Sequence, residues 1–354
     1  MPVEDNYQSK QELYDSEKVF DTMTVDLQLT NTEFDGNLIY LLKQIKVDGK
    51  LHKNELLKEL QESLGPVFRG LEVDHAYTED HSSWSVFYAL KEIIDQISNR
   101  LKVGYKTVYR GQPGDWELRP TLFRKGVSGY TDEFRRNYEQ IYKSVAQKFP
   151  ENVSYFSIHE NLDKRAANLA ELQHYGLGTP LIDVSSNPFI SLLFMVDGYA
   201  NQGDEPQLDI FFVREDGQNS LYQEVTKREQ NRRISVQKGA FLNFDKLDMN
   251  GLSGERKIPR ICLRLQYVRS SLDSATVVNL PDGDLPVAQD EGRVKVNVLA
   301  TAVNDIKSKL NSYYYRTEDL FPDFYMFLGV LKSKYADVGH VDVNKWYQVV
   351  ENKK

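Results

Sequence analysis

The sequence predicts an α+β fold, in which a mixed or antiparallel sheet is flanked by helices and joined to a helical N-terminal region. The chain has 354 residues, of which 40% are hydrophobic and 27% are charged, so it can bury a large core. Short segments with strand character are interspersed with amphipathic helical patterns. They do not alternate strictly, as they would in a doubly wound parallel sheet, and no internal repeat or heptad pattern is present.

The N-terminal part is expected to be helical after a polar lead-in. Residues 1–30 are polar and acidic, and we expect an extended arm or a partly ordered lead-in there. Residues 38–64 carry leucine and isoleucine at helical spacing, with Gly49 as a breaker and Gly65-Pro66 ending the pattern. Residues 1–79 are therefore predicted to be a polar arm and a small helical region.

The main domain is expected over residues 80–335, followed by a C-terminal tail at 336–354. Helical patterns in it present one apolar face or, after an Asn-Pro start, an apolar run typical of a buried helix. These patterns predict helices at 86–100, 132–149, 162–175, 187–196 and 299–310. Apolar segments rich in β-branched and aromatic residues predict strands at 107–110, 181–184, 208–213, 240–244 and 258–265.

Charge and composition limit the function classes. The net charge of −8 gives no global attraction to nucleic acid and leaves only a local basic cleft open. The N-terminal residues lack the basic and apolar regions of a signal peptide, and no apolar run approaches the roughly 20 residues of a membrane span. We therefore expect a cytoplasmic protein. Cys262 is the single cysteine, which excludes a disulfide within the chain, and an inert buried thiol is favoured over a nucleophile.

Three short segments combine polar side chains with glycine or proline. They are Tyr109-Arg110-Gly111-Gln112, Leu172–Asp183 and Arg233–Phe241. Such segments are too polar for a core element and too interrupted for a regular surface helix. We therefore interpret them as the walls of a binding site.

The first segment supplies candidate anion-binding residues. Arg110 follows a predicted strand, and its guanidinium suits a phosphate or carboxylate through bidentate donation. Gly111 would let a ligand approach the backbone, and Gln112, Arg119 and Arg124 add donors within a short reach. Taken alone, Arg110 is also consistent with a solvated or ion-paired side chain.

The second segment supplies candidates for proton transfer and polar contacts. His174 can exchange a proton near neutral pH, although a structural hydrogen-bonding role is slightly favoured. Asp183 lies in an apolar strand, so we expect it to accept hydrogen bonds from Arg110 or from backbone amides of the next turn. Ser185 or Ser186 is a candidate cap of the following helix. The ligand-binding candidates of this region are Gln173, Tyr175, Thr179, Ser185 and Ser186.

The third segment contributes Gln237 and Phe241. An amide does not titrate usefully, so Gln237 cannot act as a general base, but it can bind a hydroxyl or an amide. Phe241 can stack on a base, the alternative being a place in the core. No histidine or carboxylate spacing predicts a metal site.

These segments resemble the bacterial FRG domain, whose aromatic-Arg-Gly motif stands here as Tyr109-Arg110-Gly111. The similarity covers about residues 80–330 and carries five signals in the order of the family. They are Tyr109–Gln112, Gln173–Asp183, Asn187-Pro188, Gln237–Phe241 and Leu320–Asp323. Phe68-Arg69-Gly70 spells the same motif but lacks the following Gln, so it is set aside. The sequence departs from the family at Leu181 and at Val184-Ser185, where an Arg and a Trp-Thr are frequent.

The resemblance implies an effector of bacterial phage defence, of the abortive-infection or toxin type. The order of Arg110, the strand through Ser185-Ser186 and Gln237 is also similar to that of ADP-ribosyltransferases. In that class the arginine binds the phosphates of NAD, and a later acidic residue holds the ribose. The similarity implies NAD or a related nucleotide as ligand, with transfer of ADP-ribose or cleavage of the nucleotide.

The catalytic candidates implied by this similarity are Arg110, His174, Asp183 and Gln237. Gln237 stands where a glutamate is expected, so Asp183 or Glu171 would have to supply the carboxylate. Two alternatives stay open. One is a non-catalytic sensor of a nucleotide or a phage protein, and the other is a purely structural interaction module.

Overall fold

The computed structural model describes residues 7–34, 37–74, 85–126, 129–199, 204–214, 221–225, 232–247, 257–269 and 291–320, together with residue 328. The strands within these ranges are β1 (Phe20–Phe34), β2 (Asn37–Val47), β3 (Tyr105–Gln112), β4 (Leu181–Ser185), β5 (Gln207–Arg214), β6 (Tyr222–Gln223), β7 (Gly239–Asn243) and β8 (Ile258–Tyr267). They form one eight-stranded sheet in the order β2-β1-β8-β5-β3-β4-β7-β6. The β1 and β8 strands are parallel and the other neighbours antiparallel, so the predicted α+β class with a mixed sheet is confirmed.

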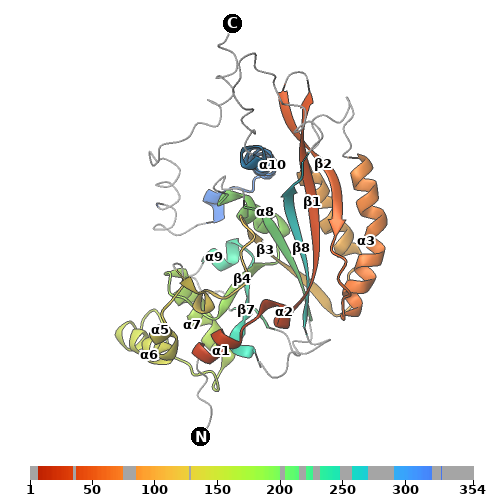
Figure 1. The fold of residues 1–354 in the computed structure, drawn as a ribbon. Coiled ribbons are helices and arrows are strands. Elements are labelled where there is room, and N and C mark those ends of the chain that lie inside the picture. Colours follow the sequence, from red (N-terminus) through yellow and green to blue (C-terminus); the bar gives the residue numbers. More distant parts are fainter. Residues whose placement is uncertain are drawn as a thin grey trace, which may run out of the picture.

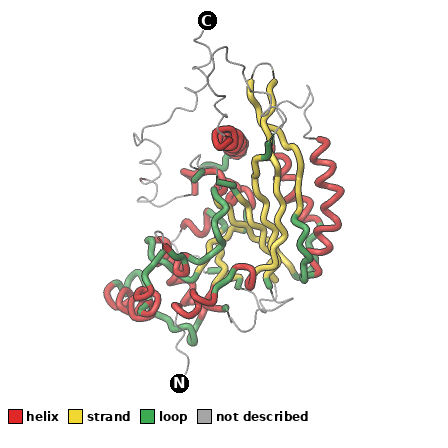
Figure 2. The backbone as a smooth tube through the Cα atoms, in the orientation of Figure 1, coloured by secondary structure: helices red, strands yellow, loops and turns green. Residues whose placement is uncertain are grey.

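Helices pack around this sheet, as Figure 1 and Figure 2 show. The described α-helices are α1 (Tyr7–Leu13), α2 (Ser16–Val19), α3 (Glu55–Asp74), α4 (Val86–Asn99), α5 (Asp132–Arg136), α6 (Tyr138–Lys148), α7 (Leu162–His174), α8 (Pro188–Asp197), α9 (Arg232–Val236) and α10 (Glu291–Ser312). The short 3₁₀ helices within the described ranges are η2 (Thr121–Phe123), η4 (Phe244–Lys246) and η7 (Thr317–Leu320). All the helices and strands predicted beyond residue 85 are present. The helix expected at 132–149 is interrupted at Asn137, which ends α5 and precedes α6.

The extended arm expected at residues 1–30 is wrong for the part that the structure describes. Residues 7–19 form α1 and α2, and β1 then runs parallel to β8 from Phe20↔Ile258 to Leu29↔Tyr267. The many polar residues of β1 hide a two-residue alternation, whose buried members are Met23, Val25, Leu27 and Leu29. Such alternation is the signature of a strand with one buried face, and overall composition masks it.

The helix expected from residue 38 is also corrected. Residues 37–47 form β2, which pairs antiparallel with β1, because a short apolar run fits either period and the neighbouring strand decides between them. Gly65-Pro66 does not end a helix either, since α3 continues through Pro66 to Asp74. The i, i+4 series of Leu60, Leu64 and Phe68 stays buried along that helix. Phe68, from the motif that was set aside, therefore belongs to the core.

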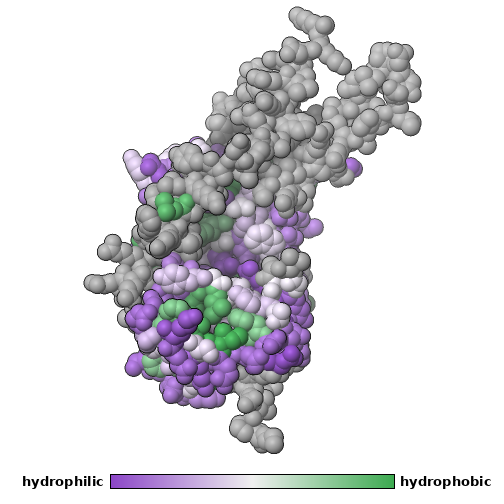
Figure 3. Space-filling model, turned by 90° about the vertical axis from the view of Figure 1, so that its left-hand side faces the viewer, coloured by the Kyte–Doolittle hydropathy of each residue, from purple (hydrophilic) through white to green (hydrophobic). Residues whose placement is uncertain are grey.

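The two faces of the sheet support two apolar clusters. One gathers side chains of β1, β5 and β8 under α3, α4, α8 and α10. The other joins β4 and β7 to α1, η2, α6 and α7. Figure 3 shows apolar residues gathered on the lower part of one face of the molecule, surrounded by hydrophilic ones. Within the described ranges, no helix is long and apolar enough to cross a membrane. The tail expected at 336–354 lies outside these ranges.

Candidate functional site

The three motif segments line one pocket with a volume of about 460 Å³. It lies where β3 and β4 meet, and α7, α8 and α9 contribute to its walls. Ten of the predicted site residues line it: Arg110, Gly111, Gln112, Arg124, Gln173, His174, Asp183, Ser185, Gln237 and Phe241. Four predicted residues do not line it: Arg119, Tyr175, Thr179 and Ser186.

The pocket forms at a weak junction in the sheet. The β3 and β4 strands share only the residue pair Tyr109↔Ser185, whereas β3 pairs with β5 over its whole length. Beyond that pair, Arg110 bridges the two strands, because its Nη1 donates to the backbone carbonyl of Asp183 at 2.8 Å. Its Nε also donates to Oε1 of Gln112 at 3.3 Å. Arg110 thus replaces a missing backbone contact and places its guanidinium in the pocket.

Gly111 allows α8 to pack closely against β3. A Cβ atom there would lie 1.8 Å from the carbonyl oxygen of Ser191 and 2.5 Å from the backbone nitrogen of Met195. Both distances are far below contact distance, so no other residue fits without moving the helix. The backbone that approaches Gly111 this closely belongs to α8, and Gly111 also lines the pocket.

Two guanidinium groups share the pocket. Burial lowers the pKa of Arg124, the positive charge of Arg110 lowers it further, and Asp183 acts in the opposite direction. Among the residues that the structure describes, none accepts a hydrogen bond from the Arg124 guanidinium. Two adjacent cations, one of them lacking an acceptor, make this part of the pocket attractive to an anion.

The backbone at Arg124 is held in place by Arg135, whose side chain is 4% exposed. Nη1 of Arg135 donates to the carbonyl oxygens of Tyr130 at 2.7 Å and Arg124 at 3.4 Å. Its Nη2 forms an ion pair with Asp132 at 2.5 Å. The loop that carries Arg124 is thereby fixed.

Arg119 has a different role from the one expected. It forms an ion pair with Glu117 at 2.7 Å, and its Nη1 donates to the carbonyl of Phe123 at 3.2 Å. The guanidinium also lies over the ring of Tyr14, 4.8 Å from its centroid. Arg119 therefore connects η2 to the segment between α1 and α2, and it does not line the pocket.

The carboxylate of Asp183 is exposed and is oriented by Gln173. Nε2 of Gln173 donates to Oδ2 of Asp183 at 2.7 Å, and Oε1 of Gln173 accepts from the buried hydroxyl of Thr179. The expectation that Arg110 or turn amides bind this carboxylate is corrected, since Arg110 contacts the carbonyl oxygen of Asp183 instead. Thr179 acts behind the pocket wall, through Gln173.

His174 lines the pocket at the end of α7. Its ring meets the edge of the Tyr175 ring with centroids 5.0 Å apart, while Tyr175 itself is 72% exposed and lies outside the lining. Local backbone conformation and packing explain why glycine follows at positions 176 and 178. Gly176 has φ of +89°, and Gly178 lies against Tyr130, whose ring would be 2.2 Å from a Cβ atom.

Ser185, at the end of β4, and Ser186, which follows it, do not cap α8. Asn187 caps it, since Oδ1 of Asn187 accepts from the backbone amides of Phe189 at 2.9 Å and Ile190 at 3.4 Å. The Ser185 hydroxyl donates to the carbonyl of Gln237 at 2.7 Å, which ties β4 to the end of α9. Ser186 donates to the carbonyl of Lys238 at 3.4 Å and lies outside the lining.

Gln237 and Phe241 line the pocket opposite β3. Nε2 of Gln237 donates to the carbonyl of Leu320 at 3.0 Å, so one side of its amide is engaged with η7. Phe241 is 4% exposed and pairs in register with Asp183 across β4 and β7. It forms an apolar wall beneath that carboxylate.

Several lining residues were missed by the sequence analysis. Trp116 lies between the first motif and Arg119, and it is 54% exposed. The sequence analysis also missed three lining residues of α8, because this helix was expected to be buried on most sides. Their three-residue spacing places them on one face of the helix; they are Ser191, Phe194 and Asp197. Asp197 forms an ion pair with Lys307 of α10 at 2.7 Å.

No metal or thiol chemistry is evident at this pocket. Across the described parts of the chain, no group of three or more His, Cys, Asp or Glu residues could hold a metal ion. Cys262 is buried outside the pocket lining, and burial raises the pKa of its thiol.

Comparison with known proteins identifies a family for one segment of the chain. No curated protein and no solved structure matches the chain. Residues 105–204 match the FRG domain family, and this segment lies inside the range of 80–335 expected for the main domain. It contributes both arginines of the pocket, together with Gln173, His174 and Asp183. The chain therefore contains an FRG domain, which supplies β3, β4, α7 and α8 around the pocket.

Proposed function

We propose that the pocket binds a nucleotide, with NAD as the first candidate, through its two arginines. The observation that carries this proposal is the pairing of Arg110 with Arg124, whose guanidinium has no acceptor among the described residues. Guanidinium groups recognise phosphate by charge-assisted hydrogen bonds. A volume of about 460 Å³ is in the usual range for pockets that bind small ligands.

The same pocket offers groups for chemistry at a ribose. Cleavage of a glycosidic bond to nicotinamide leaves a positive charge on the sugar, which a nearby carboxylate stabilises. Asp183 is exposed to the pocket and oriented by Gln173, so it is our candidate for the carboxylate that Gln237 cannot supply. Asp197 is less suited because Lys307 already neutralises it. His174 is the candidate for proton transfer.

At the level of the cell, we propose a cytoplasmic FRG-domain effector of phage defence or of toxin type, which transfers ADP-ribose to a macromolecule or cleaves the nucleotide. This rests on the FRG domain together with the pocket. Binding without turnover would instead indicate the sensor class, in which the ligand or a phage protein changes the state of the protein.

The test compares Arg124→Gln with Arg136→Gln. Both changes remove one positive charge, but Arg136 is exposed on α5 and lies outside the pocket. Binding of NAD and ADP-ribose is measured by calorimetry, and nicotinamide release is followed in the same samples. We expect Arg124→Gln to weaken binding about 10-fold or more, since hydrogen bonds to charged groups contribute about 1.5–3 kcal/mol.

Arg136→Gln should bind as the unaltered protein does. Equal affinity in both variants would overturn the phosphate role of Arg124. Expression of the two variants in growing cells then separates effector from sensor: an effector slows growth only with an intact pocket, whereas a sensor binds ligand and leaves it unchanged.

A further inference from the structure

Trp116 is the pocket residue with the largest exposed aromatic surface. Trp116 is 54% exposed, whereas Tyr109 and Phe241 are 4% exposed and Phe194 is partly buried. An exposed indole forgoes the free energy that burial of its large apolar surface would provide. The exposed position of this ring at the pocket therefore calls for a functional explanation.

The backbone of Trp116 is fixed by two buried glutamines. Its carbonyl oxygen accepts from Nε2 of Gln112 at 3.0 Å and from Nε2 of Gln207 at 3.3 Å. These glutamines are both 4% exposed and face each other in the register of β3 and β5. Gln112 also accepts from Arg110, so the same side chain orients a pocket arginine and the tryptophan.

Gly114 leaves the space that the ring of Trp116 occupies. A Cβ atom on Gly114 would lie 2.9 Å from Nε1 and 3.0 Å from Cε2 of the indole, so only glycine admits the ring in this position. The chain thus uses two buried amides and one glycine to hold an exposed indole beside two cations. Such preorganisation lowers the entropy that ligand binding would otherwise lose.

We propose that Trp116 stacks on the aromatic base of the ligand, so that the pocket selects nucleotides over phosphorylated sugars. This proposal rests on the proposed function, because the arginines supply the phosphate contact. Stacking suits a purine and a nicotinamide ring alike, since each has a flat π face. A phosphorylated sugar without a base gains nothing from the indole.

The experiment measures the affinity of the full chain for AMP, nicotinamide mononucleotide and ribose 5-phosphate. The variants are Trp116→Ala, Trp116→Phe and Arg124→Gln, with Phe149→Ala as a control on an exposed aromatic ring outside the pocket. We expect Trp116→Ala to weaken binding of the base-containing ligand about 10-fold or more and to leave ribose 5-phosphate unchanged. Trp116→Phe should retain most of the affinity, Arg124→Gln should weaken all three ligands, and Phe149→Ala should weaken none.

The outcomes separate the two proposals. If AMP or nicotinamide mononucleotide responds to Trp116→Ala, the responding ligand identifies the stacked base. If ribose 5-phosphate binds as tightly as both nucleotides, or Trp116→Ala weakens all three ligands equally, the stacking role is overturned and the arginine site stands. If none of the three binds the unaltered protein, the proposed function fails, and the stacking role fails with it. The thermal midpoint of Trp116→Phe checks that the loop remains folded.

Discussion

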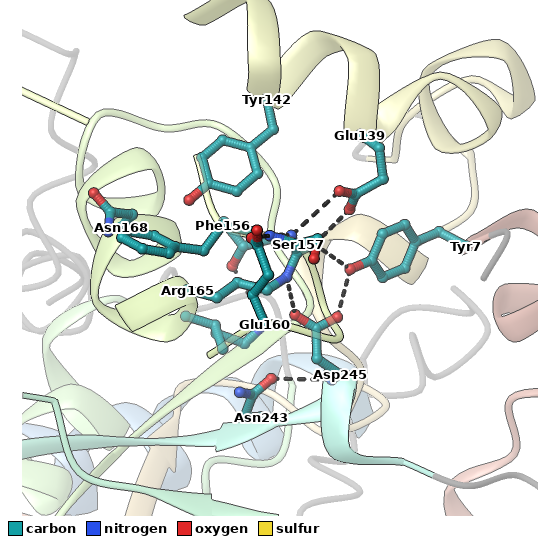
Figure 4. A network of polar contacts seen from close by, with 12 residues as sticks. Tyr7, Glu139, Tyr142, Phe156, Ser157, Glu160, Arg165, Asn168, Asn243 and Asp245 are labelled. Atoms are coloured by element: carbon teal, nitrogen blue, oxygen red, sulfur yellow. Dashed lines mark hydrogen bonds and ion pairs between the residues drawn. The ribbon is translucent and has the colours of Figure 1, made fainter. Parts of the chain in front are cut away.

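Arg165 of α7 and Asp245 of η4 form an ion pair in which neither side chain is exposed, with Nε of Arg165 2.8 Å from Oδ2 of Asp245. Figure 4 shows the surrounding network, in which Arg165 also donates to Glu139, to the Phe156 carbonyl and to the Tyr7 hydroxyl. Tyr7 in turn donates to Asp245. All five N–H groups of the guanidinium therefore have acceptors. Burial, followed by the charge of Asp245, raises the pKa of Tyr7, which stays a neutral donor.

Asp245→Asn should destabilise the protein by about 3–5 kcal/mol, because it removes the fully buried charged partner of Arg165 and leaves only the half-buried Glu139 to neutralise it. Tyr7→Phe removes one neutral hydroxyl and should cost about 1–2 kcal/mol. Urea unfolding of both variants gives the comparison. A cost below about 1 kcal/mol for Asp245→Asn would contradict the importance of the pair.

Gly111→Ala should destabilise the protein by about 1–3 kcal/mol, because its methyl group would overlap the backbone of α8. Gly70→Ala is the matched control: Gly70 lies inside α3, and a Cβ atom there meets nothing within 4 Å. That change should be neutral or should stabilise by up to about 1 kcal/mol, through helix propensity. Thermal unfolding measures both, and an unaltered midpoint in Gly111→Ala would refute the close packing.

Asp21 should make stability depend on pH in the acidic range. Burial opposes ionisation of Asp21, but hydrogen bonds from His52 and from the amides of Asn54 and Lys53 outweigh it, so the pKa is lowered. A carboxyl group with a lowered folded-state pKa stabilises above its unfolded pKa of about 3.9 and loses this contribution as pH falls through the folded value. The stability difference between the unaltered protein and Asp21→Asn should therefore be full near pH 6 and shrink below about pH 4. Denaturant midpoints across this range test it; a constant difference would show that the ionised form is not responsible.

Asp183→Asn should separate binding from chemistry. The carboxylate faces Arg124 and weakens the attraction of the pocket for an anion, so its neutralisation should tighten phosphate binding several-fold at low salt. If the protein turns over NAD, the same change should lower the turnover rate about 100-fold or more, as loss of a preorganised electrostatic group does. Calorimetry and nicotinamide release provide the two readouts. Weaker binding in Asp183→Asn would mean that the carboxylate contacts the ligand directly.

Most elements beyond residue 85 could be predicted because their apolar periodicity is strong and their ends carry ordinary signals, as in α4 and α8. The strands β1 and β2 could not, since their pairing with β8 and with each other decides their structure. The motifs located most of the pocket. They did not reveal that Asn187 and not a serine caps α8, because neighbouring side chains compete as acceptors for the same amides. They also did not reveal that Gly111 serves packing, because that depends on a contact between segments distant in the chain.

The single residue pair between β3 and β4 has a mechanical consequence for the sheet. Five strands lie on one side of this junction and three on the other, and one ladder position with the Arg110 side chain joins their backbones. Few backbone hydrogen bonds cross this junction, so the connection between the two parts of the sheet depends mainly on side chains, namely Arg110 and the apolar cluster that spans both parts. A ligand that contacts both Arg110 and β4 would add a further connection between the two parts of the sheet, so its binding should stabilise their relative position.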